Sequence, residues 1–214
     1  MIPAMIANPS SGIREFPLLL RGVACVLGGV TLFSGLDLVI EAGGAVAVRG
    51  PAGAGKSALL RLLAGVISPA AGEIVWADGR TPRQVPERAL SVGREDALKP
   101  ALTVAENLGF WSAFLDLRAW PRGGDPFGTW ILADVPVAAL SAGQRRCVAL
   151  TRLALAETGL WLLDDPGAGL DGTARHRLAD LVARHRARGG AVAFSGDLAI
   201  PGAREIALGE GAAS

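Results

Sequence analysis

Residues 50–57 have the types and spacing of a phosphate-binding loop. They form a complete G-x-x-x-x-G-K-S pattern, Gly50-Pro51-Ala52-Gly53-Ala54-Gly55-Lys56-Ser57. Glycines in such a loop let backbone N–H groups converge on phosphate oxygens, and the N-terminus of a following helix adds partial positive charge. In this pattern Lys56 reaches the β- and γ-phosphates, and the hydroxyl of Ser57 is a ligand of Mg²⁺. The spacing therefore predicts a site for a nucleoside triphosphate.

The segments on either side of this loop decide between a phosphate site and an ordinary glycine-rich turn. An apolar run at residues 45–48 precedes the loop, and residues 58–63 have the composition of a helix. Strand, glycine-rich loop and helix in this order are the context in which the pattern binds phosphate. We therefore expect a phosphate site and not a simple turn.

A pair of carboxylates, Asp164 and Asp165, follows the apolar run at residues 160–163. A continuous apolar run of this length is typical of a strand buried on both faces. A carboxylate at the C-terminal end of such a strand, beside a phosphate loop, is a common way to hold Mg²⁺. Acidic residues also end strands merely to cap a turn, but the phosphate loop favours the metal role for Asp164.

A third element is a serine followed by small residues at a predicted helix start, Leu140-Ser141-Ala142-Gly143-Gln144. A serine N-cap with small neighbours is another potential anion site. This segment resembles the L-S-G-G-Q signature of ATP-binding-cassette ATPases, with Ala142 in place of the first glycine. Residues 169–171, Gly-Leu-Asp, resemble the D-loop that follows it. The order of the motifs is also that of the cassette, and the chain is identified as a member of this superfamily.

The resemblance implies both a fold and an assembly. The fold would be an α/β P-loop NTPase with a RecA-like core, an antiparallel β subdomain and a small α-helical subdomain at about 105–140. This ATPase domain would cover residues 18–214, after an N-terminal extension at 1–17. Cassette ATPases work as head-to-tail dimers, so Ser141, Gly143 and Gln144 would contact the ATP held by the other subunit's phosphate loop. Lys56 would act in catalysis.

Within the superfamily, the chain resembles the ATP-binding subunit of the haem exporter of bacterial cytochrome c maturation. The resemblance lies in residues 32–36, 98–108 and 140–153. It implies a homodimer that joins integral membrane transporter subunits at the cytoplasmic face of the inner membrane and uses ATP to release a haem-loaded chaperone. Its link to haem would be indirect. The alternatives are the ATPase of another small-solute transporter and an ATP-gated dimerisation module with impaired hydrolysis.

Several positions depart from the cassette pattern. Asp165 stands where the family usually has the glutamate that polarises the attacking water, and Ser195-Gly196-Asp197 replaces the segment with the switch histidine. The Q-loop glutamine is replaced by Arg94, which can neither ligate Mg²⁺ nor accept a proton. The usual adenine-stacking aromatic is absent near Leu27. We expect slow hydrolysis with Asp165 as the catalytic carboxylate, because a base must lie within hydrogen-bond reach of its proton. The alternative is a chain that binds ATP and barely hydrolyses it.

The elements that must position these residues can be predicted from periodicity and turn residues. Strands alternating with helices indicate a parallel α/β sheet. The expected strands are two within residues 23–40 around Gly28-Gly29, then residues 45–48, 74–76, 160–163, 191–194 and 205–208. The expected helices follow the phosphate loop, run from Thr103 to about Arg118, follow Ser141, and run from Asp171 to Gly189-Gly190.

Composition sets the remaining bounds. The 214 residues are 50% hydrophobic and carry a net charge of +1, which suits one globular domain and gives no argument for a nucleic-acid partner. The arginines after Asp171 could meet anionic lipid, but a solvated helix face is the simpler interpretation. Phe110, Trp111 and Phe114 fall at helical spacing, and they suit a core or an exposed patch for a membrane subunit equally.

Overall fold

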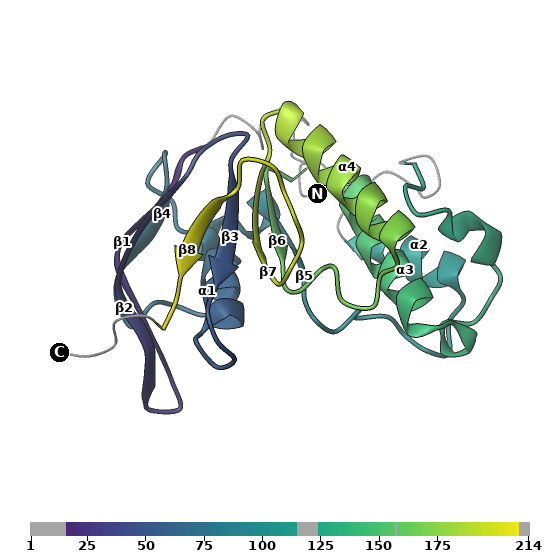
Figure 1. Cartoon of the computed structure of the whole chain (residues 1–214), viewed down its shortest axis with the longest axis horizontal. Coiled ribbons are helices and arrows are strands. Elements are labelled where there is room, and N and C mark those ends of the chain that lie inside the picture. The colour runs from purple at the N-terminus through teal and green to yellow at the C-terminus, as the bar shows by residue number, and fades with distance from the viewer. Residues whose placement is uncertain (1–15, 115–123, 157, 210–214) are drawn as a thin grey trace, which may run out of the picture.

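The computed structural model describes residues 16–114, 124–156 and 158–209. Within these residues the chain forms two sheets and a set of helices, with α1 between the sheets and the other helices beyond the parallel sheet (Figure 1). The combination of an antiparallel and a parallel sheet with helices confirms the predicted α/β class. The expected extension at 1–17 lies almost entirely outside the described residues, as do residues 115–123 of the expected helical subdomain.

The antiparallel sheet has the strand order β2-β1-β4. Strands β1 (Leu18–Leu27) and β2 (Val30–Ile40) form the predicted hairpin. Gly28 and Gly29, which connect them, both have positive φ, as a tight two-residue hairpin turn requires. Strand β4 (Ala71–Trp76) begins three residues before the predicted position and pairs with β1. Its first three residues are all exposed, so their sequence has no alternation of apolar and polar positions that would indicate a strand.

The parallel sheet positions the predicted phosphate loop and acidic pair. Its order is β5-β6-β7-β3-β8, from β3 (Ala45–Arg49), β5 (Ala89–Val92), β6 (Leu160–Leu163), β7 (Ala191–Ser195) and β8 (Arg204–Ala207), and every neighbouring pair is parallel. The phosphate loop follows β3 and the acidic pair follows β6, with β7 between these two strands. Because parallel strands end at the same edge of a sheet, these segments meet at one edge.

Helices cover both faces of the parallel sheet, and side chains of alternating direction separate two cores. Helix α1 (Lys56–Leu63) packs with the antiparallel sheet on the face that holds Leu160 and Leu162. Helices α3 (Ala142–Leu155) and α4 (Gly172–Ala187) pack on the face that holds Trp161 and Leu163. On that face His185 stacks on Trp161, with ring centroids 3.8 Å apart. This burial explains why residues 160–163 are all apolar.

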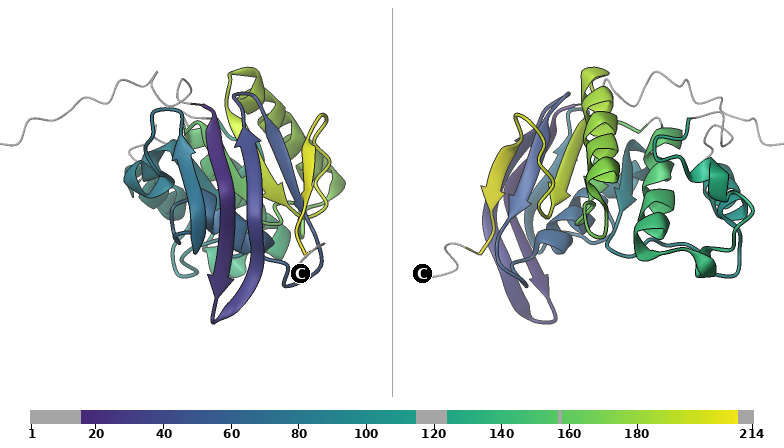
Figure 2. Two further views of the ribbon diagram at one scale, coloured as in Figure 1. Left: turned by 90° about the vertical axis from the view of Figure 1, so that its left-hand side faces the viewer. Right: turned by 45° about the vertical axis from the view of Figure 1, so that its right-hand side comes forward.

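A smaller group of helical elements lies beyond α4, on the side away from the antiparallel sheet (Figure 2). It contains α2 (Val104–Phe114) and short 3₁₀ turns at Thr129–Leu132 and Val137–Ala139, around a small core with Leu108 at its centre. Thr103 and Glu106 form the predicted capping box at the start of α2. The end of this helix beyond residue 114, expected near Arg118, lies outside the described residues.

The aromatic side chains of α2 are not core residues. Phe110 is 43% exposed and Phe114 is 68% exposed, and the two rings stack with centroids 5.9 Å apart. Trp111 is half-buried and packs against the guanidinium of Arg152. Of the two interpretations left open by the sequence, the structure therefore favours an exposed aromatic patch.

The arginines of α4 are mostly engaged within the fold. Arg177 donates to the Phe127 carbonyl, and Arg186 donates to the carbonyls of Gly43 and Pro201. Arg184 is exposed near the helix C-terminus, where a cation is favourable. These contacts agree with a structural role for the basic helix.

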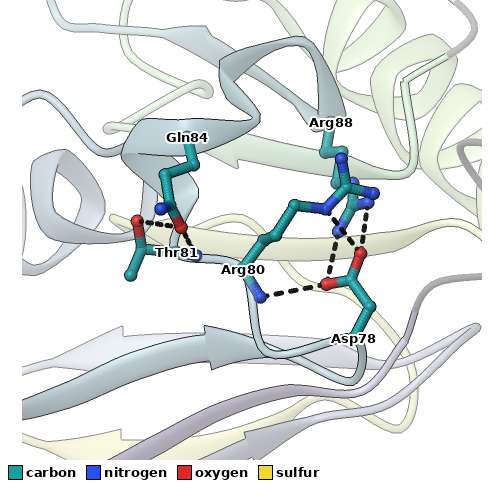
Figure 3. Close-up of polar contacts among 5 residues, drawn as sticks. All are labelled: Asp78, Arg80, Thr81, Gln84 and Arg88. Atoms are coloured by element: carbon teal, nitrogen blue, oxygen red, sulfur yellow. Dashed lines mark hydrogen bonds and ion pairs between the residues drawn. The ribbon is translucent and has the colours of Figure 1, made fainter.

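A polar cluster fastens the chain between β4 and β5 (Figure 3). The buried guanidinium of Arg88 donates to both carboxylate oxygens of Asp78, at 3.1 and 2.8 Å, and Arg80 donates to the same group. The hydrogen bond from Arg88 holds the pKa of Asp78 well below its usual range. The cluster fixes the crossing from the antiparallel sheet to the parallel one.

Candidate functional site

The phosphate loop has the conformation that its glycines permit. It leaves β3 at Arg49 and enters α1 at Lys56. Gly50, Gly53 and Gly55 have φ values of 136°, 82° and 95°, a region that L-residues rarely adopt. A side chain at Gly50 would also collide with the carbonyl of Leu208. Glycine at these three positions therefore allows the backbone turns that shape the loop.

The ammonium group of Lys56 lies across this loop. Its Nζ donates to the carbonyl oxygens of Gly50, at 2.7 Å, and Pro51, at 2.6 Å. Pro51 also accepts from the N–H of Ala54, which closes the turn at 3.3 Å. The lysine thus holds the loop shape and keeps a positive charge at its mouth.

Asp164, the predicted metal ligand, follows β6 at the edge of the sheet that carries the phosphate loop. Its side chain is only 13% exposed, and its Oδ1 accepts a hydrogen bond of 2.6 Å from the hydroxyl of Ser195, which is fully buried. Ser57 stands on the first turn of α1, across the same edge of the sheet. A hydroxyl, a carboxylate and phosphate oxygens form a donor set that fits Mg²⁺. Among the described residues, no group of three or more His, Cys, Asp or Glu side chains could hold a metal without a nucleotide.

Asp165 adopts a backbone conformation that is uncommon for a non-glycine residue. Its φ is 50°, in the left-handed region, where a non-glycine residue stores strain of about 1–3 kcal/mol. Its N–H donates to the Ser195 hydroxyl at 3.0 Å, and its carbonyl accepts from Arg146 at 3.0 Å. A Cβ at Gly196 would lie 2.5 Å from Oδ1 of Asp165. The carboxylate therefore packs against the position where the family's switch histidine was expected.

Arg146 connects several parts of the site. Its guanidinium is buried and donates to the carbonyls of Gly93, Asp164 and Asp165, at 2.7, 3.2 and 3.0 Å, and to the carboxylate of Asp96. Sequence reasoning did not single out this residue. Its helical spacing could have indicated that it is buried, because Arg146 lies four residues before the buried Leu150 and so shares a face of α3 with it.

Two pockets adjoin the phosphate loop. The larger, about 520 Å³, is lined by Val48, Arg49, Gly50, Lys56, Asp165, Ala168, Arg175, Gly196 and Asp197. The smaller, about 250 Å³, is lined by Leu27, Leu32, Ala52, Gly53, Gly55, Lys56, Ser57, Ala58, Arg61 and Arg94. The structure thus brings the loop together with Asp165 on one side and with Arg94 on the other. Leu27 offers the second pocket an aliphatic surface in place of an aromatic ring.

The signature residues form a separate site at the start of α3. Ser141 Oγ accepts from the N–H of Gln144 at 3.2 Å, and the Gln144 side chain accepts from the N–H of Ser141 at 2.8 Å, which is a capping box. At Gly143 a Cβ would lie 2.8 Å from the carbonyl of Gly169, so the helix start and the D-loop touch there. These residues and Cys147 line a pocket of about 330 Å³. Burial, and then the charge of Asp171, raise the pKa of the Cys147 thiol.

The pocket at the signature shares no residue with either pocket at the phosphate loop. The phosphate loop and the signature are therefore separate candidate half-sites within one chain. A phosphate loop and acidic strand end on a parallel sheet, with a capped signature helix beyond them, define the nucleotide-binding domain of an ATP-binding-cassette ATPase.

Comparisons with known proteins agree with this class. A family model described as "ABC transporter" matches residues 33–168. The chain is 44% identical over 200 residues to the "Cytochrome c biogenesis ATP-binding export protein CcmA" of Paramagnetospirillum magneticum, covering 88% of this chain and 92% of the relative. The protein of the same name from Rhodospirillum rubrum is 42% identical over 215 residues, with 95% and 92% covered. The chain belongs to the ABC transporter family and, within it, to the cytochrome c biogenesis ATP-binding export proteins.

Solved structures show the same fold at lower identity. An ATP-binding subunit of an ABC transporter superposes with a TM-score of 0.75 at 22% identity, covering 84% of this chain and 79% of the other. A dimeric ATP-binding cassette in a post-hydrolysis state, bound to ADP and Pi, superposes with a TM-score of 0.73 at 23% identity, covering 89% and 94%. In the described part of this chain, no helix combines the length and apolar character needed to cross a membrane.

Proposed function

We propose that this chain is the ATP-binding subunit of an ABC transporter complex for cytochrome c biogenesis. It couples the binding and hydrolysis of ATP to haem export or to the release of a haem-loaded chaperone, and its link to haem is indirect. The observation that carries this proposal is 44% identity across 88% of the chain to a cytochrome c biogenesis ATP-binding export protein. The ATPase domain spans residues 18–214, with its helical subdomain at about 105–140.

Residues 50–57 hold the phosphates of ATP. The N–H groups of the loop and the ammonium of Lys56 meet the phosphate oxygens, because the lysine can exchange its two loop carbonyls for a stronger anionic partner. Ser57 and Asp164 would hold Mg²⁺, which neutralises charge at the terminal phosphates. Ser195 keeps the Asp164 carboxylate oriented for this role.

Asp165 is the catalytic carboxylate in this proposal. A water oxygen bonds to the γ-phosphorus, the bond from that phosphorus to the bridging oxygen of ADP breaks, and Asp165 accepts the water proton. Hydrolysis is slow because this side chain is one methylene shorter than glutamate, and its backbone is pinned at both ends by Ser195 and Arg146.

A second copy of the chain completes each ATP site. Ser141, Gly143 and Gln144 of one copy close on the nucleotide held by the other copy's phosphate loop, since the two half-sites do not share a pocket within one chain. The homodimer joins integral membrane transporter subunits at the cytoplasmic face of the inner membrane as a peripheral subunit. The exposed aromatics of α2 supply an apolar surface for such a partner.

The second candidate function for this chain is an ATP-gated dimerisation module with impaired hydrolysis. The observations that favour it are Asp165 in place of glutamate and the glycine at position 196. A single-turnover assay distinguishes the two functions when it is run with the purified membrane complex. We expect phosphate release from the wild type and none from Lys56→Ala. ATP-dependent dimerisation without phosphate release above that control would favour the module.

The transport assignment needs its own test, which is purification of the complex from membranes. Haem-handling membrane proteins should co-purify with the chain and dissociate from Phe110→Ala/Phe114→Ala. The control is Val66→Ala, an exposed apolar residue that follows α1 and is not part of α2. Recovery of a complex with an unrelated small-solute permease would instead identify another transporter.

A further inference from the structure

Arg94 places a guanidinium group between the phosphate loop and Asp164. Its Nε lies 3.7 Å from Oδ1 of Asp164. The same side chain lines the 250 Å³ pocket together with Gly53, Lys56 and Ser57. A cation therefore already stands beside Lys56 and Ser57, the loop residues proposed to meet the terminal phosphates and Mg²⁺.

The backbone of Arg94 is fixed while its side chain is not. The carbonyl of the preceding residue, Gly93, accepts a 2.7 Å hydrogen bond from the buried guanidinium of Arg146, which also donates to the carbonyl of Asp164. The Arg94 side chain itself is 64% exposed, so little packing opposes a change of rotamer. Arg94 can thus reorient about an anchor that stays beside the site.

The present partner of Arg94 is a weak one. A contact of 3.7 Å between a mostly exposed guanidinium and a carboxylate is screened by water. Asp164 has another partner in the Ser195 hydroxyl at 2.6 Å. A phosphate group offers arginine two parallel, charge-assisted hydrogen bonds, which the observed geometry with Asp164 does not provide.

We propose that Arg94 is a triphosphate-binding residue that exchanges Asp164 for the terminal phosphate when ATP enters. This inference rests on the proposed ATP site. The guanidinium supplies part of the positive charge that a phosphate loop otherwise obtains from Mg²⁺. Release of Arg94 also leaves Asp164 available as a metal ligand. The affinity of this chain for ATP therefore depends less on Mg²⁺ than it would if Lys56 were the sole cation at the phosphates. It also depends more strongly on the presence of the third phosphate.

Equilibrium binding of fluorescently labelled ATP and ADP tests the proposal, with each nucleotide measured in Mg²⁺ and in EDTA. The variants are Arg94→Gln, Arg94→Ala, Arg94→Lys and the matched control Arg184→Gln, which removes an exposed arginine that lines none of the pockets described above. We expect Arg94→Gln to weaken ATP binding about tenfold in EDTA, less in Mg²⁺, and to change ADP binding less than about twofold. Arg94→Lys should fall between, and Arg184→Gln should match the wild type.

Three outcomes would overturn the proposal. ATP affinity could be unchanged in Arg94→Gln under both conditions, or the loss could be equal for ATP and ADP. Tighter binding of ATP in Mg²⁺ by Arg94→Ala, which unlike Arg94→Gln adds no possible metal ligand, would mean that the arginine competes with the metal for Asp164. Lys56→Ala separates this inference from the site itself: if the wild type and Lys56→Ala bind ATP equally, the ATP site fails and the role of Arg94 fails with it.

Discussion

The packing of Asp165 against Gly196 allows a quantitative prediction for Gly196→Ala. The φ of Gly196 is 88°, and an added Cβ would lie 2.5 Å from Oδ1 and 3.1 Å from Cα of Asp165. Two costs follow. Placing an L-residue in the left-handed region costs about 1–2 kcal/mol, and forcing a methyl group into a filled site costs about 1–3 kcal/mol. We expect a total loss in the free energy of unfolding of about 2–5 kcal/mol.

The second cost belongs mainly to the carboxylate, so it should depend on Asp165. In an Asp165→Ala background, Gly196→Ala should cost only about 1–2 kcal/mol, because the backbone cost remains while the contact with Oδ1 is gone. Urea denaturation of the wild type, the two single variants and the double variant measures this coupling. In the chain that keeps Asp165, the Gly196→Ala substitution should also slow single-turnover hydrolysis, because the added methyl group forces the carboxylate to move.

Equal costs of Gly196→Ala in the two backgrounds would refute this reasoning. They would mean that the methyl group is accommodated without touching Asp165 and that only the backbone conformation matters. A hydrolysis rate unchanged by Gly196→Ala would independently show that the observed position of the carboxylate is not the catalytic one.

Three further predictions concern buried charged and titratable groups. Arg146→Met should lower the free energy of unfolding by about 3 kcal/mol, because it leaves several inward-facing carbonyls without their donor. Asp78→Asn should cost about 2 kcal/mol in urea denaturation, because the buried guanidinium of Arg88 loses its anion. Burial lowers the pKa of His185 to about 4, so the unfolded chain binds more protons between pH 6.5 and 4, and stability should fall by about 2 kcal/mol from pH 7 to pH 5.

Each of these predictions has a matched control. Arg145→Met removes the neighbouring arginine, which makes one backbone contact, and should cost about 1 kcal/mol or less. Glu73→Gln breaks an exposed ion pair with Arg21 and should cost less than about 1 kcal/mol. His185→Phe should remove the acid loss between pH 7 and pH 5. An equal cost for a variant and its control, or a pH slope that survives in His185→Phe, would contradict the corresponding argument.

Local patterns in the sequence were sufficient for the elements that carry the site. The strand before the phosphate loop, the helix after it and the buried strand that precedes Asp164 were all predicted from residues adjacent in the chain. Ser141 and Asp171 were identified as N-caps because capping is also a local property. The family could be named from the same segments, since its motifs are local as well.

The features that depend on contacts distant in the sequence could not be predicted. Strand β5 was missed because its four residues, 89–92, form an edge strand that pairs, among the described residues, with β6 alone. The contacts of Arg146 with Gly93 and Asp165 span 53 and 19 residues, and the helical spacing of Arg146 indicates that it faces inward but not which groups it meets. Asp165 and Gly196 were each recognised as departures from a pattern, but their direct packing appears only in the folded chain.

The bonds made by Arg146 have a mechanical consequence. This residue belongs to the signature helix, yet it donates to the segment that carries Arg94 and to both acidic residues after β6. A buried carbonyl that lost its hydrogen bond to Arg146 would have no water molecule to replace it, which is energetically costly. The three segments should therefore move together as one rigid unit. In a symmetric dimer, the N-terminus of α3 in one copy would contact the nucleotide bound by the other copy. A shift of that α3 would then displace Asp164 and Asp165 of its own copy. Occupancy of either ATP would be felt at both, and the two sites should fill and empty cooperatively.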